Sequence, residues 1–251
     1  MRTLRLTRDA VHIGNLILVN RDHPHRDTGQ TLAPVDAGNS QVLLLPRCAV
    51  LFTKLMDELS AWEQIKAVSG WRTQEEQEQL YSDSLAKNGP EFTAQYVAIP
   101  GHSEHQTGLA LDLALNQPNI DAIRPHFSYT GICGAFRDKA INYGFIERYP
   151  KGKEEITGIA HEPWHFRYVG APHARIMREM GVALEEYLQR LKEFPYGGKP
   201  FRYDFDGLAI EICYLEACAD NTLFELESDL PYSVSGDNGN GFIVTVWRGR
   251  R

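Results

Sequence analysis

Apolar residues recur at helical spacing in several stretches of the chain. Residues 44–68 carry them at Leu51, Leu55, Leu59 and Trp62, which predicts an amphipathic helix that leads into an apolar strand. Residues 72–97 predict a second helix, which ends at the Asn88-Gly89-Pro90 breaker. Residues 172–194 predict a third helix, which is stopped by Pro195 and the glycine pair that follows it.

Other stretches have the pattern of β-strands. The run LALDLAL, residues 109–115, is apolar except for Asp112 and predicts a buried strand. The stretch TGIAHEPWHFRYVG, residues 157–170, is rich in β-branched and aromatic residues and is flanked by glycines, which favours a strand and a turn over a helix.

The pattern changes after Gly198. Residues 201–217 alternate between apolar and polar on both sides of Asp206-Gly207, which predicts a hairpin, and residues 235–247 predict a glycine-rich turn followed by a strand. We therefore expect an α+β chain with a domain over residues 1–198 and a small antiparallel β appendage over residues 199–251. The appendage either stabilises or oligomerises the protein, so that a homodimer is left open, or it senses substrate.

Composition narrows the class of partner. The 251 residues are 43% hydrophobic and 24% charged, as in ordinary globular proteins, and the net charge is -7. Nucleic-acid binders concentrate basic charge, so this balance predicts small molecules or peptides as partners, and no nucleic acid. The four cysteines are scattered, which predicts free buried thiols. The longest apolar run near the N-terminus, Leu16–Val19, is too short for a signal-peptide core or a membrane span, which predicts a cytoplasmic protein without membrane insertion.

The string HEPWH, residues 161–165, matches the HExxH pattern of zincin-type endopeptidases. In that pattern His161 and His165 would bind zinc from one helix, with Glu162 as general base and Glu185 or Glu186 as a further ligand. However, Pro163 lies in the middle of the string, and a proline inside a helix costs about 3 kcal/mol. The zincin hypothesis is therefore weakened but stays open at this point.

A second candidate for metal binding lies upstream, in PGHSEHQTGLALDLAL. Here His105 precedes Asp112 by seven residues, and Asp112 interrupts the apolar run. A buried carboxylate is costly unless it is paired or bound to a metal. Asp112 is therefore either bonded to backbone amides or a metal ligand.

These residues together resemble the motifs of the D-Ala-D-Ala metallopeptidases. The motif SxHxxGxAxD matches residues 103–112, and ExxH matches residues 162–165. The stretch VSGWRTQEEQ, residues 68–77, is similar to the family's SGYRS segment, and LILVNRDHP, residues 16–24, is similar to the lead-in of its VanY and VanXY branches. The resemblance covers about residues 15–195. It implies a small antiparallel central sheet flanked by helices, which is the fold of lysostaphin-type enzymes and of the sonic hedgehog signalling domain.

The resemblance also implies roles for individual residues. It implies one zinc ion on His105, Asp112 and His165, with Glu162 as base and Arg72 near the scissile carbonyl. It further implies that Ser103 and Gln77 contact the substrate, whereas Trp164 either walls the pocket or belongs to the core. Without the resemblance, Arg72 would be an ordinary solvated arginine at a helix start.

The chemistry of these residue types agrees with those roles. Three protein ligands leave a position on zinc for water, whose pKa falls toward about 7 on binding. A nearby glutamate can take the proton of that water, and an arginine can stabilise the oxyanion. The implied activity is a D,D-peptidase that removes D-Ala from peptidoglycan precursors, from D-Ala-D-Ala dipeptide, or from both, as in vancomycin resistance. A non-catalytic hedgehog-like zinc module is the remaining alternative, although the presence of Glu162 and Arg72 favours an enzyme.

Overall fold

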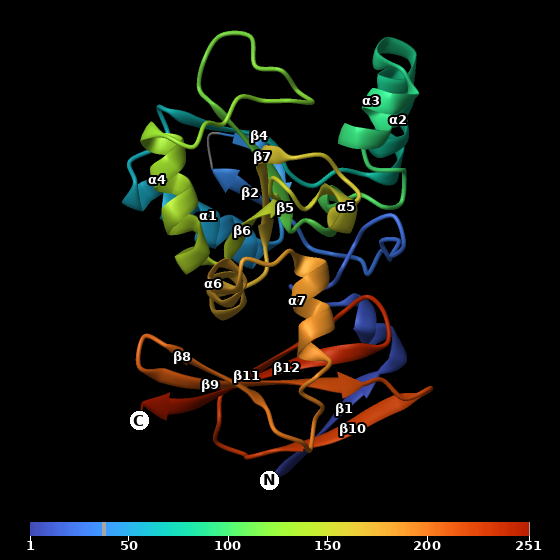
Figure 1. Ribbon diagram of the computed structural model, residues 1–251, viewed down its shortest axis with the longest axis vertical. Coiled ribbons are helices and arrows are strands. Elements are labelled where there is room, and N and C mark those ends of the chain that lie inside the picture. The colour runs from blue at the N-terminus through green and yellow to red at the C-terminus, as the bar shows by residue number, and fades with distance from the viewer. Residues whose placement is uncertain (37–38, 251) are drawn as a thin grey trace. The chain divides into compact units, whose positions relative to one another are not determined.

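The computed structural model describes residues 1–36 and 39–250, and it divides into two compact units (Figure 1). The larger unit is Val19–Ala183. The smaller unit combines Met1–Leu18 with Leu184–Arg251. Both units contain antiparallel sheet, and helices accompany it, so the expected α+β class is confirmed.

The larger unit is built on a four-stranded antiparallel sheet with the order β4-β5-β7-β6. Its strands are β4 (Ile65–Ser69), β5 (Ala110–Leu115), β7 (Glu162–Tyr168) and β6 (Phe145–Tyr149). A separate hairpin is formed by β2 (Ala33–Asp36) and β3 (Asn39–Leu44). The helices are α1 (Pro46–Glu58), α2 (Gln74–Asn88), α3 (Pro90–Tyr96), α4 (Gly131–Ala140), α5 (Glu154–Thr157) and α6 (Ala171–Met180), with the 3-10 turns η2 (Glu104–Thr107) and η3 (Ile141–Tyr143).

One face of this sheet is covered by α1 and α4, whose aromatic side chains meet those of the strands. Phe136 of α4 packs edge-on against Phe166 of β7, with ring centroids 5.1 Å apart, and Phe52 of α1 packs against Phe145 of β6. All four rings are buried. Because successive side chains of a strand point to opposite faces, His165 points away from this core when its neighbour Phe166 points into it.

The helix boundaries differ from the predicted ones in two places. The first helix ends at Glu58, so Leu59 only caps it and Trp62 lies in the turn beyond it, where its indole donates to Asp57. The third predicted helix is two helices, because Gly181 adopts a left-handed φ of 65° that ends α6. A left-handed residue cannot continue an α-helix, and glycine adopts this conformation without a Cβ clash.

The smaller unit contains α7 (Leu184–Leu191) and two antiparallel sheets. The larger sheet has the order β11-β12-β9-β8, and the other pairs β1 with β10. The strands of the smaller unit are β1 (Arg2–Thr7), β8 (Phe201–Phe205), β9 (Leu208–Glu216), β10 (Asn221–Leu226), β11 (Tyr232–Gly236) and β12 (Gly241–Arg250). The 3-10 turn η1 is Arg8–His12. The predicted hairpin is present, with Asp206 and Gly207 both at positive φ, as a two-residue type I′ turn requires.

The division into units differs from the boundary predicted after Gly198. The N-terminal strand β1 pairs with β10 along its whole length, from Arg2 opposite Leu226 to Thr7 opposite Asn221. This pairing joins segments more than two hundred residues apart, so a local change of pattern could not reveal it. Cys48 and Cys133 are buried free thiols, as expected, whereas Cys213 is half-buried and Cys218 is exposed. Among the described residues, no helix combines the length and the apolar character that a membrane span requires.

Candidate active site

The register of the central sheet places Asp112 directly beside His165. These two residues are cross-strand partners in β5 and β7. His105 arrives from η2, which ends at Gly108 with a left-handed φ of 68° and so turns the chain into β5. A Cβ at Gly108 would lie 3.2 Å from the backbone nitrogen of Leu45, which is tighter than most such contacts. Glycine is therefore needed here for its backbone freedom and for space.

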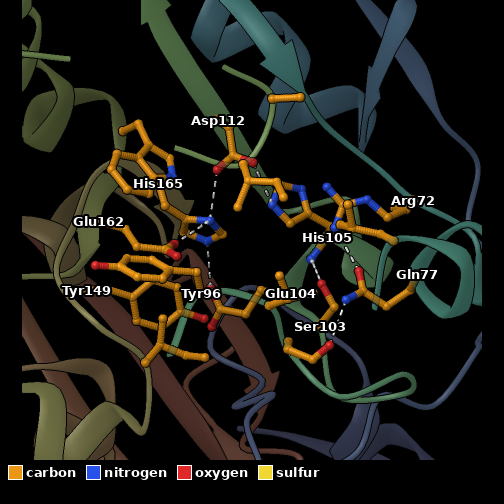
Figure 2. Close-up of a pocket in the computed structure, with 17 residues that line it drawn as sticks. Arg72, Gln77, Tyr96, Ser103, Glu104, His105, Asp112, Tyr149, Glu162 and His165 are labelled. Atoms are coloured by element: carbon orange, nitrogen blue, oxygen red, sulfur yellow. Dashed lines mark hydrogen bonds and ion pairs between the residues drawn. The ribbon is translucent and has the colours of Figure 1, made fainter. Parts of the chain in front are cut away.

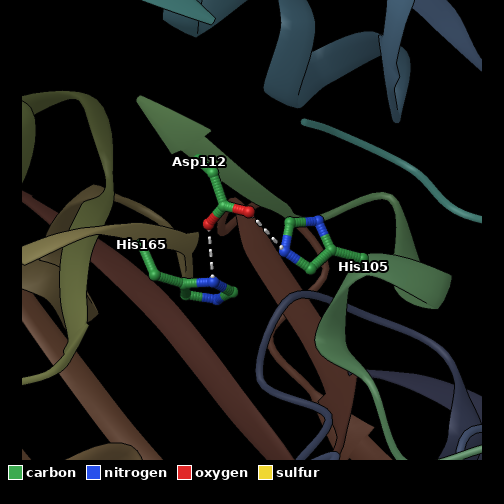
Figure 3. Close-up of side chains that lie close together, drawn as sticks. All are labelled: His105, Asp112 and His165. Atoms are coloured by element: carbon green, nitrogen blue, oxygen red, sulfur yellow. Dashed lines mark hydrogen bonds and ion pairs between the residues drawn. The ribbon is translucent and has the colours of Figure 1, made fainter. Parts of the chain in front are cut away.

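The three side chains form a compact buried group (Figure 3). His105 Nε2 lies 3.1 Å from Asp112 Oδ2, and His165 Nδ1 lies 3.0 Å from Asp112 Oδ1. One ligand atom from each residue can be chosen so that all lie within 4.8 Å of one another. Around a tetrahedral zinc with bonds of about 2.0–2.1 Å, ligand atoms are separated by about 3.4 Å. The two imidazoles and the carboxylate therefore have the spacing and the chemistry of a zinc site.

The backbone sets the orientation of the first imidazole. His105 Nδ1 lies 2.7 Å from the carbonyl oxygen of Gly70, to which it donates. In the neutral imidazole that a metal binds, Nε2 is therefore the unprotonated nitrogen, and this atom faces Asp112. A hydrogen bond from the second ring nitrogen is the usual way in which proteins orient a metal-binding histidine.

The ionisable groups of this cluster have shifted pKa values. Burial would raise the pKa of Asp112, but the facing His105 and hydrogen bonds from both histidines hold it well below its usual range. Burial lowers the pKa of His105. Burial also acts to lower that of His165, but the hydrogen bond to Asp112 and the nearby carboxylate of Glu104 outweigh it and raise the pKa to about 9. In the metal-free protein at neutral pH, His165 is therefore the protonated histidine of the pair and His105 the neutral one.

Glu162 lies beside this cluster because β7 departs from regular pairing. Glu147 of β6 pairs with Phe166, but Tyr149 pairs with Glu162, so β7 contains two extra residues in between. Pro163 lies in this irregular part and has no N–H to donate to a ladder. The irregularity lets Glu162 and His165 approach within 3.8 Å, although they are three apart in a strand. Burial raises the pKa of Glu162 well above its usual value, which suits a general base.

Arg72 lies across the cavity from Glu162 and is held by its neighbours (Figure 2). Its guanidinium donates to Gln77 Oε1 at 2.7 Å and to Ser69 Oγ at 2.9 Å. Gln77 in turn donates to the carbonyl oxygen of Ala98 at 2.7 Å. Thr73 caps α2 with a complete capping box, which fixes the start of the helix that carries Gln77. Burial lowers the pKa of Arg72, while Asp112 opposes that shift, and an arginine stays charged in either case.

The other predicted site residues also line this cavity. Ser103 and Trp164 are buried in its wall, together with Tyr149, whose ring lies 4.8 Å from that of His165. The loop before α4 contributes Ala122 and Ile123. This loop belongs to a polar segment that is interrupted by prolines. His126 in the same segment is exposed.

The zincin hypothesis is wrong. His161 precedes β7 and the rest of HEPWH lies in that strand, whereas the zincin pattern requires a helix. His161 Nε2 lies 2.7 Å from the hydroxyl of Tyr129 and 3.4 Å from Glu147, outside the cavity. Glu185 and Glu186 belong to α7 in the other compact unit. Pro163 is the physical reason, because it disfavours the helix.

Glu104 and the two arginines that contact it form a buried group that the sequence pattern did not predict. Glu104 Oε1 accepts from Arg148 Nε at 2.8 Å and from Arg167 at 2.7 Å, and these three side chains have no exposed surface. These contacts hold the pKa of Glu104 far below its usual value although burial acts to raise it. A usable signal was present, since Arg167 lies in the predicted strand HFRYV and Arg148 in the similar stretch FIERY. A charged residue in such a strand needs a buried partner.

Comparison with known proteins connects this geometry to a family. Residues 42–171 match the family described as "VanY: D-alanyl-D-alanine carboxypeptidase". The chain is 42% identical over 180 residues to the bifunctional D-Ala-D-Ala dipeptidase and D-Ala-D-Ala carboxypeptidase VanXYC of Enterococcus gallinarum. That match covers 70% of this chain and 94% of the relative.

Two solved structures extend the comparison. The D,D-dipeptidase VanXYg, solved with a D-Ala-D-Ala phosphinate analogue, matches with a TM-score of 0.96 and 46% identity, covering 98% of this chain and 99% of that chain. The D,D-pentapeptidase VanY from a VanB-type resistance cassette, solved as a mutant with Zn(II), matches with a TM-score of 0.59 and 32% identity, covering 69% of this chain and 98% of that chain. The expected small antiparallel sheet flanked by helices is therefore confirmed as the fold of this group.

Proposed function

This chain belongs to the VanY family of D-alanyl-D-alanine carboxypeptidases, and from that premise we propose that it is a zinc D,D-peptidase with two substrates. It hydrolyses D-Ala-D-Ala dipeptide and removes the C-terminal D-Ala of peptidoglycan precursors, as in vancomycin resistance. The observation that carries the proposal is the buried group of His105, Asp112 and His165 in one cavity with Glu162 and Arg72. Cytoplasmic action and a homodimer stay predictions, as does the division into a peptidase domain over residues 1–198 and a small β appendage over residues 199–251.

One zinc ion bound by His105, Asp112 and His165 is the cofactor in this proposal. Two neutral imidazoles and one carboxylate are ligands that zinc accepts, and a solved relative is a Zn(II) complex. Zinc in such a site polarises the peptide carbonyl and acidifies the attacking water. This metal set distinguishes the proposal from a purely acid–base hydrolase.

Glu162 acts as general base and then as general acid. Its raised pKa lets it hold a proton taken from the attacking water and pass that proton to the amino group of the departing D-Ala. The 3.8 Å separation between Glu162 Oε2 and His165 Nδ1 keeps the carboxylate beside the metal-binding group. Its side chain is nearly fully buried, so bulk water does not compete for the proton.

Arg72 stabilises the charge that develops on the carbonyl oxygen of the substrate. The hydrogen bonds to Gln77 and Ser69 fix the guanidinium before the substrate arrives, which is what electrostatic preorganisation requires. Ser103 and Trp164 complete the substrate contacts in this proposal. Gln77 already uses its amide oxygen and nitrogen on Arg72 and Ala98, so we assign its contribution mainly to the placement of Arg72.

The test is release of D-alanine by the zinc-loaded protein. The protein is incubated with D-Ala-D-Ala, with a pentapeptide that ends in D-Ala-D-Ala, and with L-Ala-L-Ala as the stereochemical control. We expect D-alanine from the first two substrates and no hydrolysis of the third. Release of D-alanine from neither substrate would refute the proposed function, and release from one alone would refute the dual specificity.

Glu162→Gln separates metal binding from catalysis. We expect this variant to keep zinc and to lose at least about 100-fold in turnover, since general base catalysis contributes about 10²–10⁴. Glu147→Gln is the matched control. Glu147 is another carboxylate of the same sheet, and its side chain is only 12% exposed, but it contacts Arg137, Tyr129 and His161 outside the cavity. An active Glu162→Gln protein would remove Glu162 from the mechanism.

A further inference from the structure

The ring of His165 has one nitrogen facing Asp112 and the other facing Glu104. Nδ1 lies 3.0 Å from Asp112 Oδ1, whereas Nε2 lies 3.6 Å from Glu104 Oε2. Figure 2 shows Glu104 on the side of the ring opposite to Asp112. Both Nε2 of His165 and Oε2 of Glu104 are buried, and neither has a hydrogen-bond partner within normal distance. Two unsatisfied buried polar atoms that face each other a few tenths of an ångström beyond hydrogen-bond range form a bond after a small shift.

We propose that Glu104 is a positioning residue whose carboxylate accepts a hydrogen bond from the Nε2–H of His165 and thereby directs Nδ1 of that histidine to the metal. This inference rests on the zinc site of the proposed function and adds the device that selects the binding nitrogen. His105 is oriented by a backbone carbonyl and presents Nε2, whereas His165 is oriented by a carboxylate and presents Nδ1. The short turn η2 therefore supplies one ligand, His105, and the partner of another, since Glu104 precedes His105 directly.

The two arginines hold Glu104 in place for this contact. Both Arg148 and Arg167 donate to Oε1, so Oε2 is left for His165. Arg167 lies two residues after His165 in β7 and therefore on the same face of the strand. Because all of these side chains are buried, the carboxylate cannot rotate away without leaving the arginines and taking its charge into an apolar surrounding.

A glutamine at position 104 would reverse the selection. Every neighbour of Glu104 in this arrangement is a donor, and a carboxylate accepts from all of them, whereas an amide has only one acceptor oxygen. The two arginines would donate to that oxygen, so the amide NH₂ group would face Nε2 of His165. That nitrogen would then have to be unprotonated, which moves the proton to Nδ1, the atom that is needed for the metal.

The first measurement is zinc affinity by competition with a chromophoric chelator. We expect Glu104→Gln to bind zinc about 10–100-fold more weakly than the parent protein, the range typical for partners of metal-bound histidines. Glu147→Gln, which also removes a carboxylate paired to a buried arginine, should stay within about threefold by the same reasoning. An affinity of Glu104→Gln within threefold of the parent, or an equal loss in both variants, would overturn the inference.

The second measurement reads the ring nitrogens directly and does not depend on any variant. Zinc-loaded protein with ¹⁵N-labelled histidine is recorded in a long-range ¹H–¹⁵N correlation after sequential assignment. We expect a metal-bound Nδ1 and a protonated, slowly exchanging Nε2 for His165, and the reverse pattern for His105. Metal bound to Nε2 of His165 would overturn the inference even if Glu104→Gln does not fold. Absence of D-alanine release by the parent would instead refute the proposed function and leave both readouts valid.

Discussion

The affinity for zinc should rise steeply with pH, because the metal must displace a proton from His165. Burial acts to lower the pKa of this histidine, but the hydrogen bond to Asp112 and the nearby carboxylate of Glu104 outweigh it and raise the pKa to about 9 in the metal-free protein. His165 therefore keeps its second ring proton below about pH 9 and loses it above that pH. Zinc needs an unprotonated Nδ1, so protons and metal compete for this atom at neutral pH.

The structure gives the size of the effect. At pH 7 the solution is two pH units below the pKa of His165, and each unit corresponds to about 1.36 kcal/mol. The competition therefore costs on the order of 3 kcal/mol at pH 7, or about 100-fold in apparent affinity. Solvent screening does not reduce this figure much, because the His165 side chain is only 5% exposed. The expected slope is about tenfold per pH unit up to about pH 9, followed by a plateau.

The assay is a chelator competition between pH 6.5 and 9.5, corrected for the protonation of the chelator. Glu162 also titrates with a raised pKa, and its charge would add to the slope. The measurement is therefore repeated with Glu162→Gln, which is neutral at every pH and isolates the contribution of His165. A flat affinity between pH 7 and 9 in this variant would refute the reasoning, because it would show a neutral His165 in the metal-free protein.

Three further predictions concern single residues. Arg72→Lys should lower kcat/KM for D-Ala-D-Ala by about 10²–10³ and leave zinc binding unchanged. A lysine ammonium lacks the planar guanidinium that bonds Gln77 and Ser69 while it faces the substrate. Steady-state kinetics on D-Ala-D-Ala measure the effect. His161→Ala should leave zinc affinity and turnover within about threefold of the parent, because that imidazole contacts Tyr129 and Glu147; loss of zinc would revive the zincin arrangement. Gly108→Ala should destabilise the protein by about 2 kcal/mol or more in chemical denaturation, because left-handed φ alone costs about 1 kcal/mol and the new Cβ meets Leu45. Gly152→Ala, at φ 84° with nothing within 4 Å, should show only the backbone cost, and equal losses in the two variants would contradict the crowding argument.

Local sequence pattern predicted a large part of this protein. Strand composition around Asp112 and His165 indicated β5 and β7, and Pro163 argued against a helix through HEPWH. The separated motifs indicated the family, and that prediction is confirmed by the comparisons. These features are local because residue type and spacing report burial and backbone conformation within a few residues.

Other features were decided only by tertiary structure. The sequence could not choose between His161 and Asp112 from spacing alone, whereas strand register places Asp112 beside His165 and leaves His161 outside the cavity. The role of Glu104 could not be predicted from its place next to His105, because its partners Arg148 and Arg167 come from two other strands. The pairing of β1 with β10 could not be predicted either, because the two strands lie more than two hundred residues apart in the sequence. Contacts between strands depend on register and on bulges such as the one around Pro163, and those are set by the packing of the whole sheet rather than by any short stretch of sequence.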